Sequence, residues 1–99
     1  MLNINKNKEN EKLTISLEGR LDTTTAPQLE TTLKENLGGV TELVIDFAEL
    51  EYISSAGLRV LLSAQKIMSK QGSMKVIHVS DLIKEIFEVT GFIDILTIE

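Results

Sequence analysis

The stretch LVIDFAELEYISSAGLRVLL, residues 43–62, joins a strand to a helix and sets the plan of the fold. Its beginning is a nearly continuous apolar run rich in β-branched residues, which is typical of an interior strand. AGLRVLLSAQKIMSK, residues 56–70, predicts a helix that Gly72 closes, and SMKVIHV, residues 73–79, predicts the next strand. Because a helix between two strands implies a crossover connection, we expect some of the strands to pair in parallel.

Apolar periodicity also predicts the strands and helices in the rest of the chain. KLTISLEG, residues 12–19, alternates apolar and polar residues, as a strand with one covered face does. The predicted order is β-β-α-β-α-β-α-β, with strands at residues 2–7, 12–19, 42–47, 73–79 and 94–99 and helices at residues 23–39, 56–70 and 80–91. We therefore predict one domain over residues 1–99, of the α/β class bordering on α+β, with a mixed sheet and helices mainly on one face.

Capping signals and apolar periodicity add detail to this prediction. Thr25 is expected to cap the first helix, with Gln28 completing a capping box three residues later. Ser80 is expected to cap the third helix, whose inward face is predicted to carry Leu82, Ile83, Ile86 and Phe87. The polar run Lys6–Lys12 is predicted to be a turn.

Composition excludes several kinds of partner. Ten basic and fifteen acidic residues give a net charge of −5, which argues against nucleic acid or an anionic membrane as the main partner. The sequence has no apolar run near 18 residues and no cysteine, so we expect a cytoplasmic chain without a membrane span or a disulfide. We also expect a monomer.

The sequence offers no catalytic, metal or cofactor motif. His78 is the single histidine and is interpreted as structural, and no Gly-x-Ser-x-Gly elbow or phosphate-binding loop is present. The acidic residues that follow the third strand lack the density and the turn glycine of a metal loop. We therefore expect neither an enzyme nor a bound metal or cofactor.

The junction SSAGL, residues 54–58, allows two readings. A helix start leaves backbone N–H groups unpaired, so Ser54 or Ser55 can serve as a cap worth about 1 kcal/mol. One serine is enough for that role, and the small residues Ala56 and Gly57 would leave the other hydroxyl approachable. From local physics alone, a simple cap and an exposed functional serine both remain open.

The apolar arc of the second helix is wider than packing on one sheet needs. Leu58 and Leu62 fall to one side of the sector that is expected to face the core. Either a neighbouring element covers them, or they form an exposed docking edge beside the serines.

Five features in order make the chain resemble the STAS domain of bacterial anti-sigma factor antagonists. They are the Gly-x-Leu-Asp strand end (residues 19–22), the Thr25-Ala26 helix start, the apolar strand, the serine turn and the Val-Thr-Gly-Phe segment (residues 89–92). The resemblance covers essentially the whole chain. It implies a four- or five-stranded mixed sheet with the helices largely on one side.

The resemblance also implies a partner-switching function. Such an antagonist binds an anti-sigma factor that is also a serine kinase of the GHKL type, is released when the kinase phosphorylates it, and is reset by a PP2C-type phosphatase. In a sporulation regulator of this family the turn reads Asp-Ser-Ser-Gly-Leu, and alignment on Gly57-Leu58 makes Ser55 the acceptor. Ser54 takes the place of the aspartate and is the alternative acceptor. The implied partner-binding residues are Asp22, Thr25, Ser54, Ser55, Gly57, Leu58, Arg59 and Leu62.

Two other functions are compatible with the same domain. The first is a STAS subunit of another complex, such as a lipid-transport ABC system or a stress-signalling scaffold, that phosphorylation does not control. The second is nucleotide binding, for which the sequence offers no phosphate-binding motif.

Overall fold

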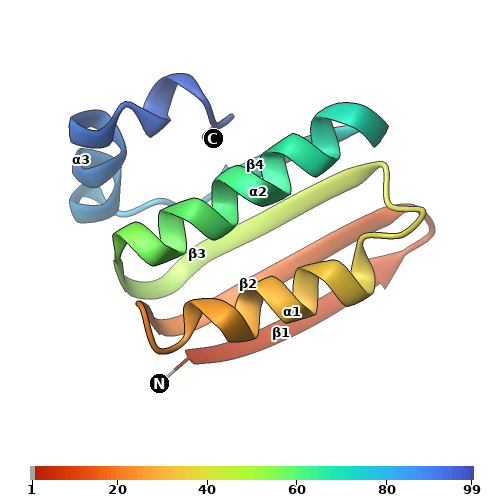
Figure 1. The fold of residues 1–99 in the computed structure, drawn as a ribbon, viewed down its shortest axis with the longest axis horizontal. Coiled ribbons are helices and arrows are strands. Elements are labelled where there is room, and N and C mark those ends of the chain that lie inside the picture. The colour runs from red at the N-terminus through yellow and green to blue at the C-terminus, as the bar shows by residue number, and fades with distance from the viewer. Residues whose placement is uncertain (1) are drawn as a thin grey trace.

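A four-stranded mixed sheet organises the molecule (Figure 1). The computed structural model describes residues 2–99. The strands are β1 (Leu2–Glu9), β2 (Lys12–Leu21), β3 (Glu42–Ile53) and β4 (Ser73–Ile77), and they lie side by side in that order. β1 pairs with β2 antiparallel, whereas β2 with β3 and β3 with β4 are parallel pairs. The predicted α/β class with a mixed sheet is confirmed.

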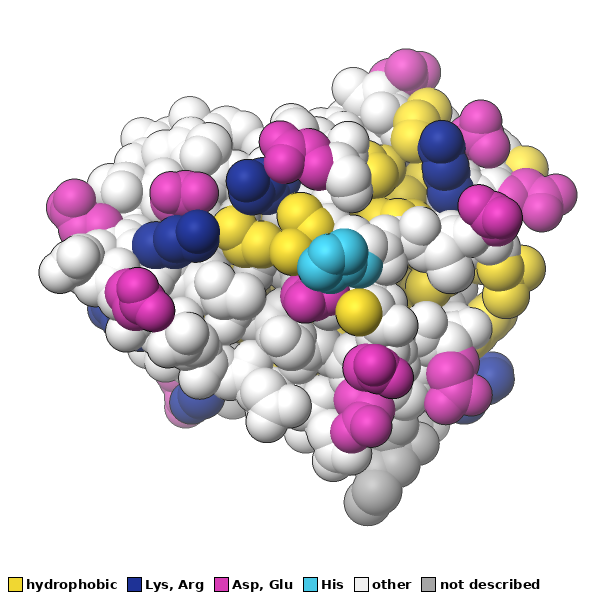
Figure 2. All heavy atoms as spheres, turned by 180° about the vertical axis from the view of Figure 1, so that it is seen from behind, with side chains coloured by type: hydrophobic (Ala, Val, Ile, Leu, Met, Phe, Trp, Pro, Cys, Tyr) yellow, Lys and Arg dark blue, Asp and Glu magenta, His cyan; other side chains and the backbone are white. Residues whose placement is uncertain are grey.

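Three α-helices connect and cover the sheet. They are α1 (Ala26–Asn36), α2 (Ser55–Gln71) and α3 (Asp81–Thr90), and a short 3₁₀ turn, η1 (Phe92–Asp94), follows α3. Figure 1 shows α1 and α2 across one face of the sheet, with α3 beside the end of α2 at which that helix begins. The opposite face of the sheet has no helix and is largely polar, and hydrophobic side chains gather at the margin where α3 lies (Figure 2).

The core lies between the sheet and the helices. Alternate residues of β2 and β3 point into it and are at most 1% exposed: Leu13, Ile15, Leu17, Leu43, Ile45 and Phe47. Leu29 of α1 and Leu61 of α2 meet them at 0% exposure. Burying each such side chain contributes about 1.5–3 kcal/mol, so the alternating pattern of the strands decides which sheet face the helices cover.

The strand boundaries differ from the prediction at several places. β3 continues to Ile53 rather than ending at residue 47, because its second half pairs with β2 up to Leu21. The predicted turn at residues 6–12 is wrong in extent: β1 continues to Glu9, and the turn is a tight one in which Asn10 takes a positive φ of 57°. An edge strand tolerates polar side chains on both faces, which the alternation rule does not anticipate.

The predicted last strand at residues 94–99 is also wrong. η1 ends at Asp94, and within the described residues the segment after it makes one isolated bridge, between Val76 and Ile98. Val76 N donates to Thr97 O at 2.9 Å, and Glu99 N donates to Val76 O at 2.9 Å. The C-terminal segment therefore covers part of the outer edge of β4 without adding a full strand.

Gly57 allows α2 to begin close to the sheet. A Cβ atom at this position would lie 2.8 Å from Leu21 Cγ and 2.9 Å from Ile53 Cγ1. Both distances are shorter than van der Waals contact, so with any larger residue either the side chains of Leu21 and Ile53 or the start of α2 must shift. The helix start and the two strand ends are thus packed as one unit.

We expect Gly57→Ala to destabilise the chain by about 1–3 kcal/mol through overpacking, although alanine favours helix by about 1 kcal/mol. Urea unfolding measures the effect. Gly38→Ala is the matched control, because a Cβ there has no neighbour within 4 Å, and it should be neutral or slightly stabilising. Equal stability of Gly57→Ala and the parent would contradict the close packing.

Candidate functional site

Ser54 is the N-cap of α2. Its backbone is extended (φ −100°, ψ 176°), and its Oγ accepts a hydrogen bond from Gly57 N at 3.5 Å. Its carbonyl accepts from Leu58 N at 2.9 Å, and its own N–H donates to Leu21 O at 2.9 Å. The half-buried Ser54 therefore performs the capping role and also ties the start of α2 to the end of β2.

Ser55 is the first residue of α2 and is exposed. Its hydroxyl has no hydrogen-bond partner within residues 2–99, in contrast to that of Ser54. Ala56 and Gly57 follow it and place no large side chain beside it. The structure thus separates the two serines, with one used in the fold and one presented at the surface.

The turn between β2 and α1 lies next to the serine turn. Asp22 Oδ1 accepts from Thr24 N at 3.0 Å and from Thr25 N at 3.1 Å. Since β2 and β3 run parallel and Ser54 bonds to Leu21, both turns leave the same edge of the sheet. Asp22 therefore lies in the same region as Ser54; its predicted contact with a partner stays a prediction.

The capping box predicted at Thr25 and Gln28 is wrong. Thr25 Oγ1 donates to Arg20 O at 2.8 Å and accepts from Asp22 N at 2.9 Å, so it faces back toward β2 rather than into the helix. Thr25 is only 8% exposed. A partner cannot contact a side chain buried in this way, so Thr25 shapes the site rather than lining it.

Arg20 and Tyr52 form a pair at this edge that the sequence analysis did not single out. They are register partners on β2 and β3, and the guanidinium carbon lies 4.6 Å from the centre of the tyrosine ring. Arg20 Nε is also 3.9 Å from Asp22 Oδ2. The sequence alone does not show that the two residues lie opposite each other on adjacent strands, because this depends on the strand register.

The predicted docking edge on α2 is wrong for Leu58. Leu58 is 5% exposed, so the reading in which neighbouring residues cover it holds. Leu62 is half-buried, and Gly57 is buried. Arg59, four residues after Ser55, is exposed.

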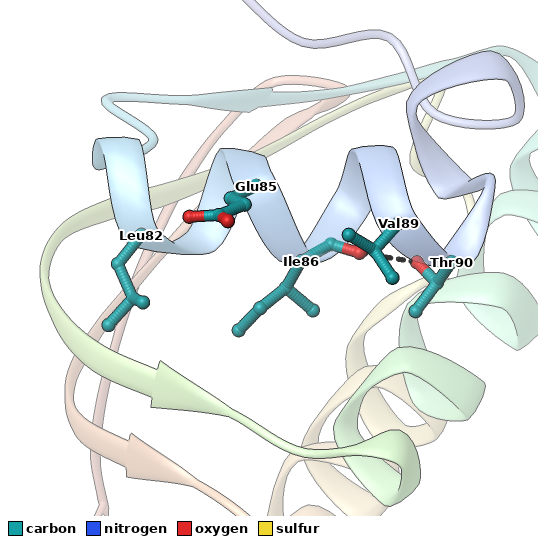
Figure 3. A pocket seen from close by; sticks show the side chains of 5 residues that line it. All are labelled: Leu82, Glu85, Ile86, Val89 and Thr90. Atoms are coloured by element: carbon teal, nitrogen blue, oxygen red, sulfur yellow. Dashed lines mark hydrogen bonds between the residues drawn. The ribbon is translucent and has the colours of Figure 1, made fainter.

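An exposed apolar stripe lies on α3 rather than on α2. Leu82 is 55% and Val89 81% exposed, and Ile86 lies between them, half-buried. We call Leu82, Ile86 and Val89 the α3 stripe; with Glu85 and Thr90 they line a shallow concavity (Figure 3). In Figure 3 the side chains of Leu82 and Ile86 extend from the same side of α3.

Part of the prediction for this helix is therefore wrong. Leu82 was expected to face inward, but the buried side chains of α3 are Ile83 and Phe87, both at 0% exposure. Phe87 packs against Phe47 of β3 with ring centres 6.2 Å apart, and this contact fixes which face of α3 is inside.

The polar groups elsewhere form no reactive cluster. His78 Nδ1 lies 2.9 Å from Asp46 Oδ1 on the helix-free face, where Figure 2 shows the histidine in cyan. Burial opposes ionisation of Asp46, but hydrogen bonds from Ala48 N–H and from His78 lower its pKa overall. Residues 2–99 contain no group of three or more potential metal ligands and no helix long and apolar enough to cross a membrane.

Comparison with known proteins gives consistent matches. The family described as "Mlab, STAS domain" matches residues 4–97. BtrV of Bordetella bronchiseptica, a candidate anti-sigma factor antagonist, is 37% identical over 84 residues, which are 83% of this chain and 72% of that protein. The anti-sigma-B factor antagonist of Bacillus subtilis is 32% identical over 100 residues, with 98% of this chain and 92% of that protein covered.

Solved structures show the same fold. An anti-sigma factor antagonist from Mycobacterium paratuberculosis superposes with a TM-score of 0.89 at 21% identity, covering 99% of this chain and 85% of that one. The antagonist SpoIIAA matches in its unphosphorylated form with a TM-score of 0.77 at 18% identity, covering 98% and 87% of the two chains. Its phosphorylated form, from Bacillus, matches with a TM-score of 0.76 at 19% identity, covering 98% and 91%.

The pKa of Asp22 lies below its usual range. The backbone N–H of Thr25 lowers it most; partial burial opposes this effect, and Thr24 N–H, the Thr25 hydroxyl and Arg20 lower the pKa further. Because the folded chain favours the ionised carboxylate, the resulting stabilisation is present above the unfolded pKa of about 3.9 and is lost as the pH falls through the folded pKa.

We therefore expect Asp22→Asn to be less stable than the parent at pH 7, with the gap in Tm closing as the pH falls from about 4 to 2. Thermal unfolding followed by circular dichroism across this range measures the gap. Asp94→Asn is the control, since no side-chain hydrogen bond joins Asp94 to another residue in the range 2–99, and its difference from the parent should not follow this course. A gap for Asp22→Asn that is independent of pH would contradict the assignment.

Proposed function

The chain belongs to the STAS domain family, and we propose that it acts as an anti-sigma factor antagonist in a partner-switching circuit. In its unphosphorylated form it binds an anti-sigma factor that is also a serine kinase of the GHKL type. Phosphorylation of Ser55 releases it, and a PP2C-type phosphatase restores the binding form. The names of the relatives and the geometry of the serine turn support this function.

The observation that carries the proposal is the different use of the two serines. Ser54 Oγ is engaged as the cap of α2, and its backbone is bonded on both sides. Ser55 is exposed at the same helix start, without a hydrogen bond to any residue in the range 2–99. A kinase needs an approachable hydroxyl, so the geometry favours Ser55 over Ser54 as the acceptor.

A phosphate on Ser55 would act on binding rather than on the fold. It adds a charge of about −1.5 to −2 at the positive end of the helix dipole, which favours it by about 0.3–1 kcal/mol. The nearly equal similarity of this chain to the unphosphorylated and phosphorylated forms of SpoIIAA supports an unchanged fold. A kinase that holds nucleotide phosphates and catalytic carboxylates near Ser55 would repel the new dianion, and a 100- to 1000-fold loss of affinity needs only about 3–4 kcal/mol.

The partner-facing surface that we propose combines the serine turn with the α3 stripe. Within residues 2–99, the large apolar side chains that are exposed belong to α3 and the residues after it: Leu82, Val89 and Ile95. Figure 1 shows α3 beside the start of α2, which supports a surface that one partner could cover together with the serine turn. Apolar contacts of the stripe would then provide most of the binding free energy, and phosphorylation of Ser55 would regulate binding.

The decisive experiment for the proposed function is phosphosite mapping by mass spectrometry after incubation with the cognate kinase and ATP. We expect phosphate on Ser55 in the parent and in Ser54→Ala, and none in Ser55→Ala, because Ser54 Oγ is committed to the cap. Phosphate on Ser54 would move the assignment to that residue. Absence of a kinase among co-purifying proteins, with a transporter ATPase in its place, would favour the alternative function as a subunit of another complex.

We expect Val89→Asp to weaken binding of the anti-sigma factor at least tenfold, about 1.4 kcal/mol, because the partner would have to bury an unpaired carboxylate. Val89 is 81% exposed, so the variant should fold normally, which circular dichroism verifies. Thr31→Asp, an exposed position on α1, is the matched control and should bind like the parent. Equal affinity of the two variants would remove the α3 stripe from the interface.

A further inference from the structure

We propose that Arg59 is the intramolecular counter-ion of a phosphate carried on Ser55. Phosphorylation would then change the docking face twice, by adding a dianion and by withdrawing the exposed cation that lies one helical turn after the serine. This inference rests on the proposed function for the presence of the phosphate, but the pairing itself depends only on the geometry of α2.

The spacing of the two residues brings them together. Ser55 is the first residue of α2, and Arg59 follows four residues later within the same helix. Side chains four apart lie on the same face of a helix with Cβ atoms about 5–6 Å apart. Because helical side chains tilt toward the N-terminus, Arg59 leans back over the turn that carries Ser55. Both residues are exposed, so no packing prevents their contact.

Arg59 is available for this role because it forms no ion pair within residues 2–99. The ion pairs within residues 2–99 engage Lys12, Arg20, Lys75 and His78, and none includes Arg59. Arg20 is further occupied by the ring of Tyr52. The next cation along α2, Lys66, is about two turns beyond Arg59 and cannot reach the helix start.

The chemistry of the pair favours arginine over other cations. A guanidinium group can donate two parallel hydrogen bonds to phosphate oxygens, whereas an ammonium group acts as a point charge. An anion placed before a cation at this spacing is also the more favourable order on a helix. Before phosphorylation the pair carries +1; afterwards it carries about −0.5 to −1, with the guanidinium oriented toward the phosphate instead of toward a partner.

The test uses protein in which phosphoserine is incorporated at position 55 during translation, so that no kinase is needed. Phosphorus NMR then follows the second pKa of the phosphate in the otherwise unchanged chain, in Arg59→Gln and in Lys66→Gln. We expect this pKa to be lower by about 0.2–0.4 with Arg59 present than in Arg59→Gln, because the cation favours the dianion. Lys66→Gln, which removes the same charge from the same helix, should behave like the unchanged chain.

Two further readouts separate pairing from general electrostatics. The guanidinium resonances of Arg59 should shift as the phosphate titrates, and Arg59→Lys should restore only part of the pKa difference because its contact is not bidentate. Identical phosphate pKa values with and without Arg59, or an equal change in Lys66→Gln, would overturn the proposal. If no kinase modifies Ser55 but the incorporated phosphate still pairs with Arg59, the proposed function fails and this inference stands.

Discussion

The parallel pairing of β2 with β3, extended at its end by the hydrogen bond from Ser54 N to Leu21 O, is the constraint on which the functional end of the molecule depends. Parallel strands finish at the same edge of a sheet, so the turn after each one leaves from the same place. The Asp22–Thr25 turn and the Ser54–Ser55 turn are neighbours for this reason. Gly57 completes the arrangement, since its missing side chain lets α2 begin directly above the two strand ends.

Much of this framework could be predicted from the sequence because it follows from periodicity. The alternation in β2, the apolar run in β3 and the helix between β3 and β4 together require a mixed sheet that is covered mainly on one face. The sequence leaves open whether Ser54 or Ser55 caps the second helix, and the dihedrals of Ser54 and its hydrogen bond from Gly57 N assign the cap to Ser54. Thr25 shows where motif reasoning fails. The residues from Thr25 to Gln28 fit the capping-box pattern, but the Thr25 hydroxyl donates a hydrogen bond to Arg20 O on β2.

The surface of the site could not be predicted in the same way, because exposure depends on which neighbour covers which face. α3 has apolar residues on two sides of the helix, and the contact between Phe47 and Phe87 decides that Ile83 and Phe87 are inside. Leu82 and Val89 are left outside as a consequence. The same kind of tertiary choice buries Leu58 on α2. For α2 the sequence indicated more apolar residues than one packed face needs, and for α3 it predicted Leu82 inside; in both helices the tertiary packing determines which face is buried.

Different residues at the serine turn hold the fold and carry the proposed switch, so the proposed phosphorylation would not require the domain to unfold. The residues that hold the turn in place are buried or bonded within the chain, as Thr25, Ser54 and Gly57 are. Ser55 and Arg59 lie outside this set and are exposed on the first turns of α2. A covalent change at Ser55 therefore alters charge where no packing contact depends on it, and the helix dipole favours the anion that would be added. The side chains that stabilise the turn thus differ from those proposed to bind the partner, so the proposed modification would change binding and leave the fold intact.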